Sequence, residues 1–423
     1  MTYQEALDFL YPLHRFGIKP GFDRVQALFD QLGSPQNRLG LVIHIAGTNG
    51  KGSVAAALAS IFQAAGRKTA LYTSPHLVDF TERMRIDGQP ISHEKVAAYS
   101  SLLKDEAVAL NATFFELTTA IAFAWFADEA VEVSVIETGM GGRLDATALV
   151  DSSYAVITSI GMDHTEWLGG TLALIAAEKA AIIKPASRVF TAVSEPEALL
   201  PIRTRAELCG ASLFVAGKDA LWTLDGASLG LLELGVRSAR FNYPALKVPL
   251  TGAFHAPNVT LAVMVAEDAG IGGEYIAQGL AGLLATGYRA RLEKISDAPA
   301  VLLDVSHNPD GMRVTVSAIE AFRQEYSRVN VVLGLASDKD AAAVIRELCR
   351  LDCAFYPVSI PSERSLPPEE IAALCRKEGA TATPFTTGRD ALSYLRQNVA
   401  SDELILVTGS FYLAGEIIAG GCG

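Results

Sequence analysis

A short apolar run, Leu41–Ala46, leads into the glycine-rich segment Gly47–Ser53, and an alanine-rich stretch follows. A strand, a glycine loop and a helix in this order bring backbone N–H groups and a helix N-terminus to one point, where they can bind a phosphate. Lys51 adds a charge for the β- and γ-phosphates, and the Ser53 hydroxyl can reach Mg²⁺. The usual P-loop has Ser or Thr directly after the lysine, whereas Gly52 stands there. The segment predicts a nucleotide triphosphate site; the alternative is a glycine turn that binds no ligand.

The composition predicts a folded protein of two domains. The chain has 423 residues, of which 50% are hydrophobic and 19% charged, and this is too long for one core. The net charge of −12 argues against a nucleic-acid or anionic membrane partner. No apolar stretch approaches the roughly 20 residues of a membrane helix. An acidic chain that binds a triphosphate must concentrate its cations locally, which singles out Lys51, Arg83, Arg85 and Arg143.

The cysteines and the N-terminal segment bear on localisation. The chain has five cysteines, an odd number without a C-x-x-C pair, and this favours reduced thiols. The N-terminal segment contains acidic residues and lacks a long apolar core, so we expect no signal peptide. We therefore expect a cytoplasmic protein.

Apolar strands alternate with helices over the first part of the chain. We expect strands at 41–46, 69–73, 131–137 and 154–160, and helices at 53–65, 93–110, 118–128, 171–183 and 194–208. Strands of this kind, separated by helices, predict a mainly parallel sheet covered on both faces. Residues 211–250 lose the helical period and predict short antiparallel strands.

The pattern resets near residues 285–292. We expect strands after it at 301–305, 329–335, 354–359 and 404–408, and helices at 310–326, 341–351, 368–377 and 389–398. The sequence therefore predicts an α/β protein. Its large domain, residues 1–286, has a P-loop-type, mainly parallel sheet and a small antiparallel subsheet, and its smaller C-terminal domain, residues 287–423, is a Rossmann-like α/β unit.

Polar clusters follow four of the predicted strands, at 73–76, 137–145, 159–164 and 304–309. Ligands bind at strand ends in open α/β sheets. Glu137 ends an apolar strand, and a buried carboxylate there needs a cation, either a metal ion or a salt-bridge partner. Ser74 and His164 follow neighbouring strands, although His164 could instead be a hydrogen-bonded structural histidine. Oxygen ligands with one imidazole favour Mg²⁺ or Mn²⁺ over structural zinc.

Long motifs occur in order along nearly the whole chain. They are GTNGKGS, SPHL, TERMRI, TFFELTTAIAF, ETGMGGRLDAT, SIGMDHTEWLG, EKAAIIKP, HAPN, DVSHNPDG, LGLASDKD and GSFYLAGE. With these motifs the chain resembles the folylpolyglutamate synthase/dihydrofolate synthase family of the ATP-dependent Mur ligase superfamily. The resemblance implies an ATP-binding central domain and a C-terminal glutamate-ligase domain. It also implies a reaction in which L-glutamate is added to dihydropteroate or reduced folates through an acyl phosphate.

The resemblance implies a set of residues for ATP and metal. Those that match the phosphate-binding loop are Asn49, Gly50, Lys51 and Gly52, with Ser53 close to the metal. Those that match the magnesium ligands are Ser74, Glu137 and His164. Lys179 matches a lysine that the family carries N-carboxylated, able to hold a second Mg²⁺; without the motif it would be read as a solvated helix lysine. Such a lysine must have its charged form disfavoured. A monovalent cation is left open.

Further residues match the nucleotide and substrate sites of the family. Asn258, Arg291 and Asp304 match contacts to adenine, phosphate and ribose. The residues that match the pterin pocket are Thr113, Phe114, Phe115, Glu116, Leu144, Asp145 and Ala146. The two phenylalanines can hold a flat heterocycle, although aromatics at a helix start are often core residues. His307 lies where the family approaches the incoming glutamate, so we expect Lys51, Lys179 and His307 to be catalytic.

The chain departs from the family pattern at several positions. Arg289-Ala290 replaces Pro-Gly before Arg291, so the hinge could differ and Arg289 could compete for the phosphate. Ala148 replaces an asparagine, and Ala181 and Ala186 replace glycines near the lysine motif. Apart from the change at Ala148, whose effect is left open, none of these changes removes a chemical group that the reaction needs.

Some alternatives stay open at this stage. They are a Mur ligase acting on a cell-wall precursor, an inactive nucleotide-binding paralogue, and a kinase that stops at phosphoryl transfer. Because the glycine loop begins near residue 47, we expect no uridine-nucleotide domain of the kind that a cell-wall ligase has before it. The sequence does not separate dihydrofolate synthase from folylpolyglutamate synthase activity, and we favour both because segment 17–24 resembles the pterin side. We expect a monomer that closes its small domain over ATP and both substrates.

Overall fold

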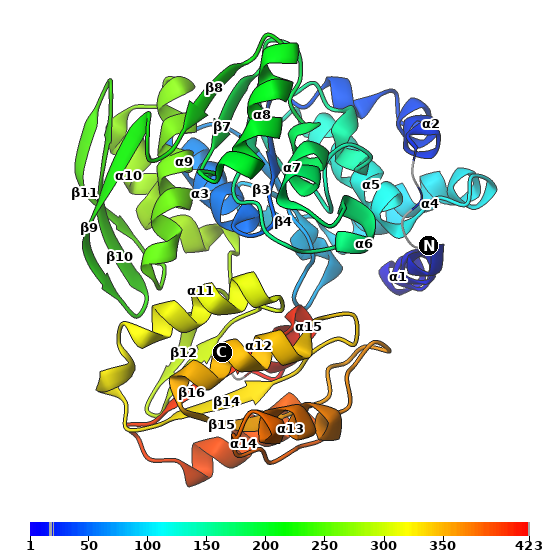
Figure 1. The fold of residues 1–423 in the computed structure, drawn as a ribbon. Helices are drawn as coiled ribbons and strands as arrows, with labels where there is room; N and C mark the ends of the chain where they lie inside the picture. The colour runs from blue at the N-terminus through cyan, green and yellow to red at the C-terminus, as the bar shows by residue number, and fades with distance from the viewer. Residues whose placement is uncertain (17–18, 20, 422–423) are drawn as a thin grey trace.

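The computed structural model describes residues 1–16, 19 and 21–421. Residues 17, 18 and 20 of the predicted pterin-side segment 17–24 therefore lie outside the described residues. The first part of the chain builds an eight-stranded sheet in the order β4-β3-β2-β5-β1-β6-β7-β8 (Figure 1). The strands are β1 (Leu41–Ala46), β2 (Thr69–Tyr72), β3 (Met84–Ile86), β4 (Gln89–Pro90), β5 (Val133–Glu137), β6 (Tyr154–Ile157), β7 (Arg188–Thr191) and β8 (Ser212–Val215). Only β3 runs against the other strands; it pairs antiparallel with β2 on one side and with the edge strand β4 on the other. The predicted mainly parallel sheet is confirmed.

Helices cover both faces of this sheet because its central strands are apolar on both sides. Ile43 and Ile45 pack with α3 (Lys51–Ala64), α9 (Ala256–Asp268) and α10 (Gly273–Ala281). Val42 belongs to the core on the other face, which includes α1 (Tyr3–Leu10), α2 (Asp23–Gln31), α4 (His93–Ala109) and α5 (Phe114–Asp128). Beside them lie α6 (Thr165–Leu168), α7 (Leu172–Ala180) and α8 (Pro196–Leu208).

A three-stranded antiparallel sheet follows β8. It confirms the antiparallel strands predicted for residues 211–250 except at Ser212–Val215, which is β8 and pairs parallel with β7 in the large sheet. Its strands are β9 (Ala220–Ser228), β10 (Leu231–Ser238) and β11 (Asn242–Val248), in the order β11-β10-β9. Leu232, Leu234 and Val236 of β10 join the core that contains α9 and α10. We call the part of the chain with these two sheets the N-terminal unit.

The rest of the chain forms a five-stranded sheet in the order β12-β13-β16-β14-β15, and we call this part the C-terminal unit. Its strands are β12 (Glu293–Asp297), β13 (Ala300–Leu303), β14 (Val329–Leu333), β15 (Cys353–Pro357) and β16 (Leu404–Thr408), of which only β12 is antiparallel. Its helices are α11 (Pro309–Glu320), α12 (Ala341–Leu348), α13 (Pro368–Lys377), α14 (Gly388–Asn398) and α15 (Phe411–Ala419). The first three share one core face and the last two the other.

Several element boundaries differ from the prediction for local reasons. Helix α5 begins at Phe114 rather than 118, because Thr113 and Glu116 form a capping box there. Strand β6 ends at Ile157 rather than 160, because the following residues turn to support the glycine loop. The sequence analysis did not predict the helices α1, α2, α6, α9, α10 and α15 or the strands β3, β4, β7 and β12. Short 3₁₀ helices lie at Tyr11–Phe16, Pro35–Asn37, Phe80–Arg83, Ala146–Leu149, Ala253–His255, Leu283–Thr286, Arg323–Glu325 and Cys349–Leu351. No described helix is both long and apolar enough to cross a membrane.

Candidate active site

The glycine loop has the geometry of a phosphate-binding loop. Gly50 is the N-cap of α3 with φ 88°, and a Cβ there would lie 2.6 Å from Oδ1 of Asn258. Only glycine fits this left-handed and crowded position. The hydroxyls of Thr158 and Ser159 donate to the Asn49 carbonyl over 2.7 and 2.9 Å. The end of β6 thus holds the loop, and the predicted contact residue Asn258 lies against it.

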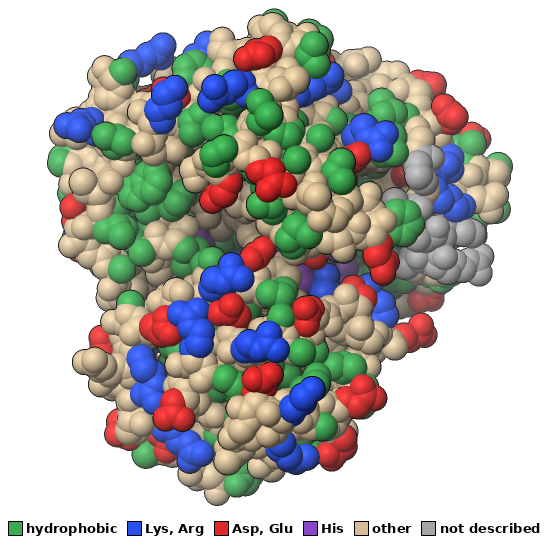
Figure 2. Space-filling model, in the orientation of Figure 1, with side chains coloured by type: hydrophobic (Ala, Val, Ile, Leu, Met, Phe, Trp, Pro, Cys, Tyr) green, Lys and Arg blue, Asp and Glu red, His purple; other side chains and the backbone are tan. Residues whose placement is uncertain are grey.

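A cavity of about 200 Å³ opens in front of the loop, between the two units. The predicted residues that line it are Asn49, Gly50, Lys51, Gly52, Ser53, Ser74, Glu137, His164, Lys179, Arg291 and His307. Figure 2 shows the surface hollowed where the two units meet, with histidine visible inside. The sequence analysis placed these residues in separate segments of the chain, several of them at strand ends, and the fold brings them to one cavity.

Two charged side chains face each other in this cavity. Nζ of Lys51 lies 3.9 Å from Oε1 of Glu137 and donates to the Gly47 carbonyl over 3.0 Å. Glu137 is 5% exposed, and burial raises the pKa of its carboxyl, while the Lys51 charge lowers it. The backbone N–H of Ser74 donates to Oε2 of Glu137 over 3.4 Å. Lys51 therefore compensates part of the cost of burying the Glu137 carboxylate.

The residues present fit a magnesium ion whose coordination is completed by phosphate and water. The chain supplies a hydroxyl, a carboxylate and an imidazole in Ser74, Glu137 and His164, which line one cavity. Burial lowers the pKa of His164, so the neutral ring that can bind a metal is favoured. Within the described residues, no three His, Cys, Asp or Glu side chains cluster closely enough to hold a metal without such help. Three protein ligands of this kind leave coordination positions for phosphate oxygens and water, as a magnesium ion that binds together with a triphosphate requires.

Lys179 is buried, so the reading as a solvated helix lysine is wrong. It lies at the end of α7, is 4% exposed, and its Nζ donates to the Gly47 carbonyl over 3.0 Å. Burial, and after it the charge of Lys51, lowers its pKa to about 7. A substantial fraction of its amine is therefore neutral near pH 7, which is the condition for reaction with CO₂.

The two other residues predicted to contact the nucleotide, Arg291 and Asp304, differ in whether they line the cavity. Arg291 lines the cavity, with its guanidinium carbon 4.8 Å from the ring centre of Phe411. Asp304 is 3% exposed and does not line the cavity; its carboxylate accepts from the N–H of Leu292 over 3.1 Å and from the hydroxyl of Thr315 over 3.0 Å. Its contact with ribose stays a prediction. Arg289 pairs with Glu293 at 2.7 Å and lies outside the cavity lining, which leaves Arg291 as the phosphate candidate.

All seven residues predicted for the pterin pocket line a second cavity, of about 460 Å³, which we call the pterin-side cavity. They are Thr113, Phe114, Phe115, Glu116, Leu144, Asp145 and Ala146. Phe115 packs on Gly139, where a Cβ would lie 2.5 Å from the ring. Glu116 accepts from the N–H of Thr113 over 2.7 Å and pairs with Arg24 at 3.0 Å. The cavity thus combines aromatic faces with carboxylates held in place.

His307 lies between the site and a third, larger cavity of about 860 Å³, which we call the interdomain cavity. Its Nδ1 is 2.9 Å from the Val305 carbonyl, and its ring centre is 5.9 Å from that of Phe411. Burial lowers the pKa of His307, so its ring is favoured in the neutral form. The position is consistent with an approach route for a second substrate.

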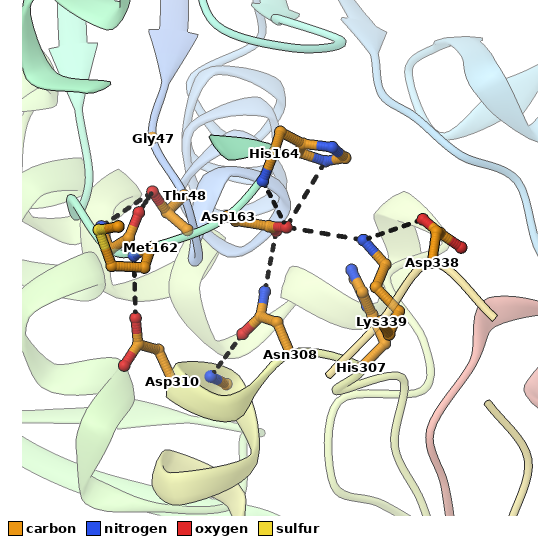
Figure 3. A network of polar contacts seen from close by, with 12 residues as sticks. Gly47, Thr48, Met162, Asp163, His164, His307, Asn308, Asp310, Asp338 and Lys339 are labelled. Carbon is orange, nitrogen blue, oxygen red and sulfur yellow. Dashed lines mark hydrogen bonds and ion pairs between the residues drawn. The ribbon is translucent and has the colours of Figure 1, made fainter. Parts of the chain in front are cut away.

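The sequence analysis missed a polar network that joins the two units (Figure 3). Asp163 accepts from the backbone N–H of His164 over 2.9 Å and from the Asn308 amide over 3.0 Å, and it lies 3.6 Å from Nζ of Lys339. Asp310 accepts from the N–H of Met162 over 3.2 Å. These residues lie inside the motifs GMDH, SHNPD and SDKD, so the signal was present, but the residues gave no indication of mutual contact.

Two family models match successive parts of the chain. Residues 45–266 match the Mur ligase middle domain, and residues 290–411 match the Mur ligase, glutamate ligase domain. The chain is 33% identical to the dihydrofolate synthase/folylpolyglutamate synthase of Bacillus subtilis, covering 98% of both chains. It is 33% identical to the folylpolyglutamate synthase of Lacticaseibacillus casei, covering 99% of this chain and 98% of that one.

Solved structures are similar over the whole fold. E. coli FolC in complex with DHPP and ADP has a TM-score of 0.90 and 29% identity, covering 99% of this chain and 97% of that chain. A bifunctional folylpolyglutamate synthase/dihydrofolate synthase with Mn, AMPPNP and L-glutamate bound has a TM-score of 0.87 and 28% identity, covering 99% and 98%.

Proposed function

We propose roles for the site residues of this chain, which belongs to the dihydrofolate synthase/folylpolyglutamate synthase family of Mur ligases. The chain is an ATP-dependent ligase that adds L-glutamate to dihydropteroate or reduced folates. A single observation carries the assignment of roles: Lys51, Glu137, His164 and Lys179 line one cavity in front of the glycine loop. The cell-wall and inactive alternatives are not favoured by these relatives.

The reaction consists of two displacements. A carboxylate oxygen of the pteroate or folate attacks the γ-phosphorus of ATP, and ADP leaves as the acyl phosphate forms. The amino group of L-glutamate then attacks the acyl carbon, phosphate leaves, and the amine loses a proton as the amide forms. Lys51 and the N–H groups of the loop stabilise the charge on the transferring phosphoryl group. Magnesium, when bound, supplies further positive charge to the phosphate oxygens.

Ser74, Glu137 and His164 would hold the first magnesium ion. Lys179, N-carboxylated by CO₂, would hold a second, and its burial beside Lys51 supports this assignment because it favours the neutral amine. Asn258 and Arg291 would contact the adenine and phosphate parts of ATP, and Asp304 the ribose. His307 would orient the incoming glutamate.

The pterin would bind in the pterin-side cavity between Phe114 and Phe115, where aromatic faces suit a flat heterocycle. We further infer that residues 1–286 and 287–423 are the two domains and that they close over the substrates. The contacts of Asp163 with Asn308 and Lys339 support closure at this point. Four cysteines, Cys209, Cys349, Cys353 and Cys375, are free thiols, which supports a cytoplasmic protein, and we propose a monomer.

Product analysis tests the function. The purified protein is incubated with ATP, Mg²⁺ and L-glutamate, with either dihydropteroate or tetrahydrofolate, and products are identified by mass spectrometry. We expect a mass increase of one glutamyl residue and phosphate release that depends on L-glutamate. Phosphate release without glutamate would favour the kinase, and no product with any pterin would favour the inactive paralogue.

A further inference from the structure

Arg83 lies where two cavities meet. It is the last residue of the 3₁₀ helix Phe80–Arg83 before β3 and lines both the pterin-side cavity and the interdomain cavity. Only Pro75 and Arg364 among the described residues share this position with it. Arg83 does not line the cavity in front of the glycine loop.

The Arg83 guanidinium is buried without an anionic partner in the described part of the chain. The residue is 6% exposed, and no described carboxylate lies within ion-pair distance of it. The adjacent Glu82 carboxylate instead accepts from the N–H groups of Leu77 and Asp79, over 2.9 and 2.8 Å. Burial lowers the pKa of Arg83, although an arginine stays charged at neutral pH. A buried, unpaired cation is destabilising, so its presence here points to an anionic ligand.

Local contacts hold the guanidinium in one orientation. Nε donates to Nδ1 of His76 over 2.8 Å, and the guanidinium carbon lies 5.1 Å from the ring centre of Phe114. Within the described residues, this Nε bond is the one hydrogen bond of the guanidinium, so both terminal NH₂ groups have no hydrogen-bond partner there. A pair of such groups can bind a carboxylate through two parallel hydrogen bonds.

The position of Arg83 indicates which carboxylate it meets. The carboxylate that is phosphorylated must reach Lys51, in a cavity that Arg83 does not line. Arg83 therefore suits a second, unreactive carboxylate on a ligand that also occupies the pterin-side cavity. A folate that ends in a glutamyl residue has one, the α-carboxylate, whereas dihydropteroate has only the carboxylate that reacts.

We propose that Arg83 binds the α-carboxylate of the terminal glutamyl residue of a folate substrate and so favours glutamylated acceptors over dihydropteroate. The proposal rests on the proposed function, because it assumes that pteroates and folates bind in the pterin-side cavity. It assigns to one residue the ability to distinguish the two acceptor classes.

The test compares two ligands that differ by one glutamyl residue. Dissociation constants of dihydropteroate and dihydrofolate are measured by calorimetry with the full chain, Mg²⁺ and a non-hydrolysable ATP analogue. We expect Arg83→Gln to weaken dihydrofolate binding at least tenfold and to change dihydropteroate binding less than twofold. Equal losses for both ligands, or no loss for dihydrofolate, would overturn the proposal.

Two further variants separate a specific effect from a general one. Arg364→Gln is the matched control, because Arg364 lines the same two cavities but its side chain is 60% exposed and 3.9 Å from Asp338; we expect less than threefold change for either ligand. Arg83→Lys, which keeps the charge, should show an intermediate loss for dihydrofolate alone, and it serves as the test if Arg83→Gln does not fold.

The outcomes also separate this proposal from its premise. A wild-type protein that binds neither ligand would overturn the proposed function, and this proposal with it. Normal ligand binding by the wild type with equal effects of Arg83→Gln on both ligands would overturn this proposal alone. A rise in the KM for L-glutamate with dihydropteroate as acceptor would assign Arg83 to the incoming amino acid and contradict the proposal.

Discussion

Lys179 and Lys51 donate to the same carbonyl oxygen, that of Gly47, each over 3.0 Å. The two amines come from different helices, α7 and α3, and meet at the glycine loop, where both line the cavity in front of it. The proximity of Lys51 adds to the effect of burial on Lys179 and disfavours a second positive charge. This arrangement supports the proposed roles, in which Lys51 binds the phosphates and the neutral amine of Lys179 reacts with CO₂.

The carboxylation of Lys179 should depend on pH in a defined direction. The amine reacts with CO₂ only when neutral, and a pKa of about 7 means that the neutral fraction rises between pH 6 and pH 8. At a fixed CO₂ pressure, we expect a ¹³C-carbamate NMR signal that grows over this range. The signal should be absent in Lys179→Met. An unchanged signal in that variant would exclude Lys179 as the carboxylated residue.

Lys179→Ala should lose activity while keeping its fold. The variant removes the proposed ligand of the second magnesium ion, and we expect kcat to fall at least 100-fold, about 3 kcal/mol of transition-state stabilisation. It also removes a buried amine whose charged form is disfavoured, so the melting temperature should not fall greatly. Steady-state kinetics and thermal unfolding check both statements. Full activity in this variant would refute its metal-bridging role.

Glu137→Gln should separate metal binding from stability. The amide keeps the size of the side chain and removes a charge that burial disfavours, so the unfolding free energy should be unchanged or higher. We expect kcat to fall at least 100-fold and the Mg²⁺ concentration for half-maximal rate to rise. Magnesium titrations of both proteins measure this. An unaltered magnesium dependence would remove Glu137 from the ligand set.

Asp163→Asn should weaken closure of the two units. The side chain contacts Asn308 and Lys339 across the cavity, and the variant loses the charge that Lys339 meets. We expect less compaction in small-angle scattering when ATP and a pteroate are added, and about a tenfold lower kcat/KM. The control is Asp338→Asn, which removes the other acidic neighbour of Lys339, at 3.7 Å. Identical effects of the two variants would argue against a specific role for Asp163.

Glycine substitutions at Ala186 and Ala181, two positions where the family pattern has glycine, should change the stability of the protein in opposite directions. Ala186 has φ 57°, a left-handed conformation that is costly for alanine, whereas Ala181 has φ −65° at the end of α7. Ala186→Gly should stabilise the protein by up to about 1 kcal/mol. Ala181→Gly should destabilise it by about 0.5–1 kcal/mol. Denaturant unfolding of both variants gives the comparison; a destabilised Ala186→Gly would contradict the backbone argument.

The sequence predicted β1, β2, β5 and β6 of the large sheet and β13–β16 of the C-terminal sheet, because these strands are apolar runs bounded by glycines and polar clusters. It missed the short strands β3, β4, β7 and β12. It also predicted that Ser74, Glu137 and His164 lie together, since the ends of parallel strands meet at one edge of a sheet, and all three line one cavity. It could not reveal the burial of Lys179, because an amphipathic helix can place a lysine on either side. The contacts of Asp163 with Asn308 and Lys339 were equally hidden, because they depend on how the two units pack.

A crystal structure with a non-hydrolysable ATP analogue and Mg²⁺ tests the central claim most directly. We predict that the γ-phosphate lies in the cavity in front of the glycine loop, with one magnesium ion bound to Ser74, Glu137 and His164 and with Lys51 on the phosphate oxygens. Phosphates that bind away from Glu137 and His164 would contradict the account.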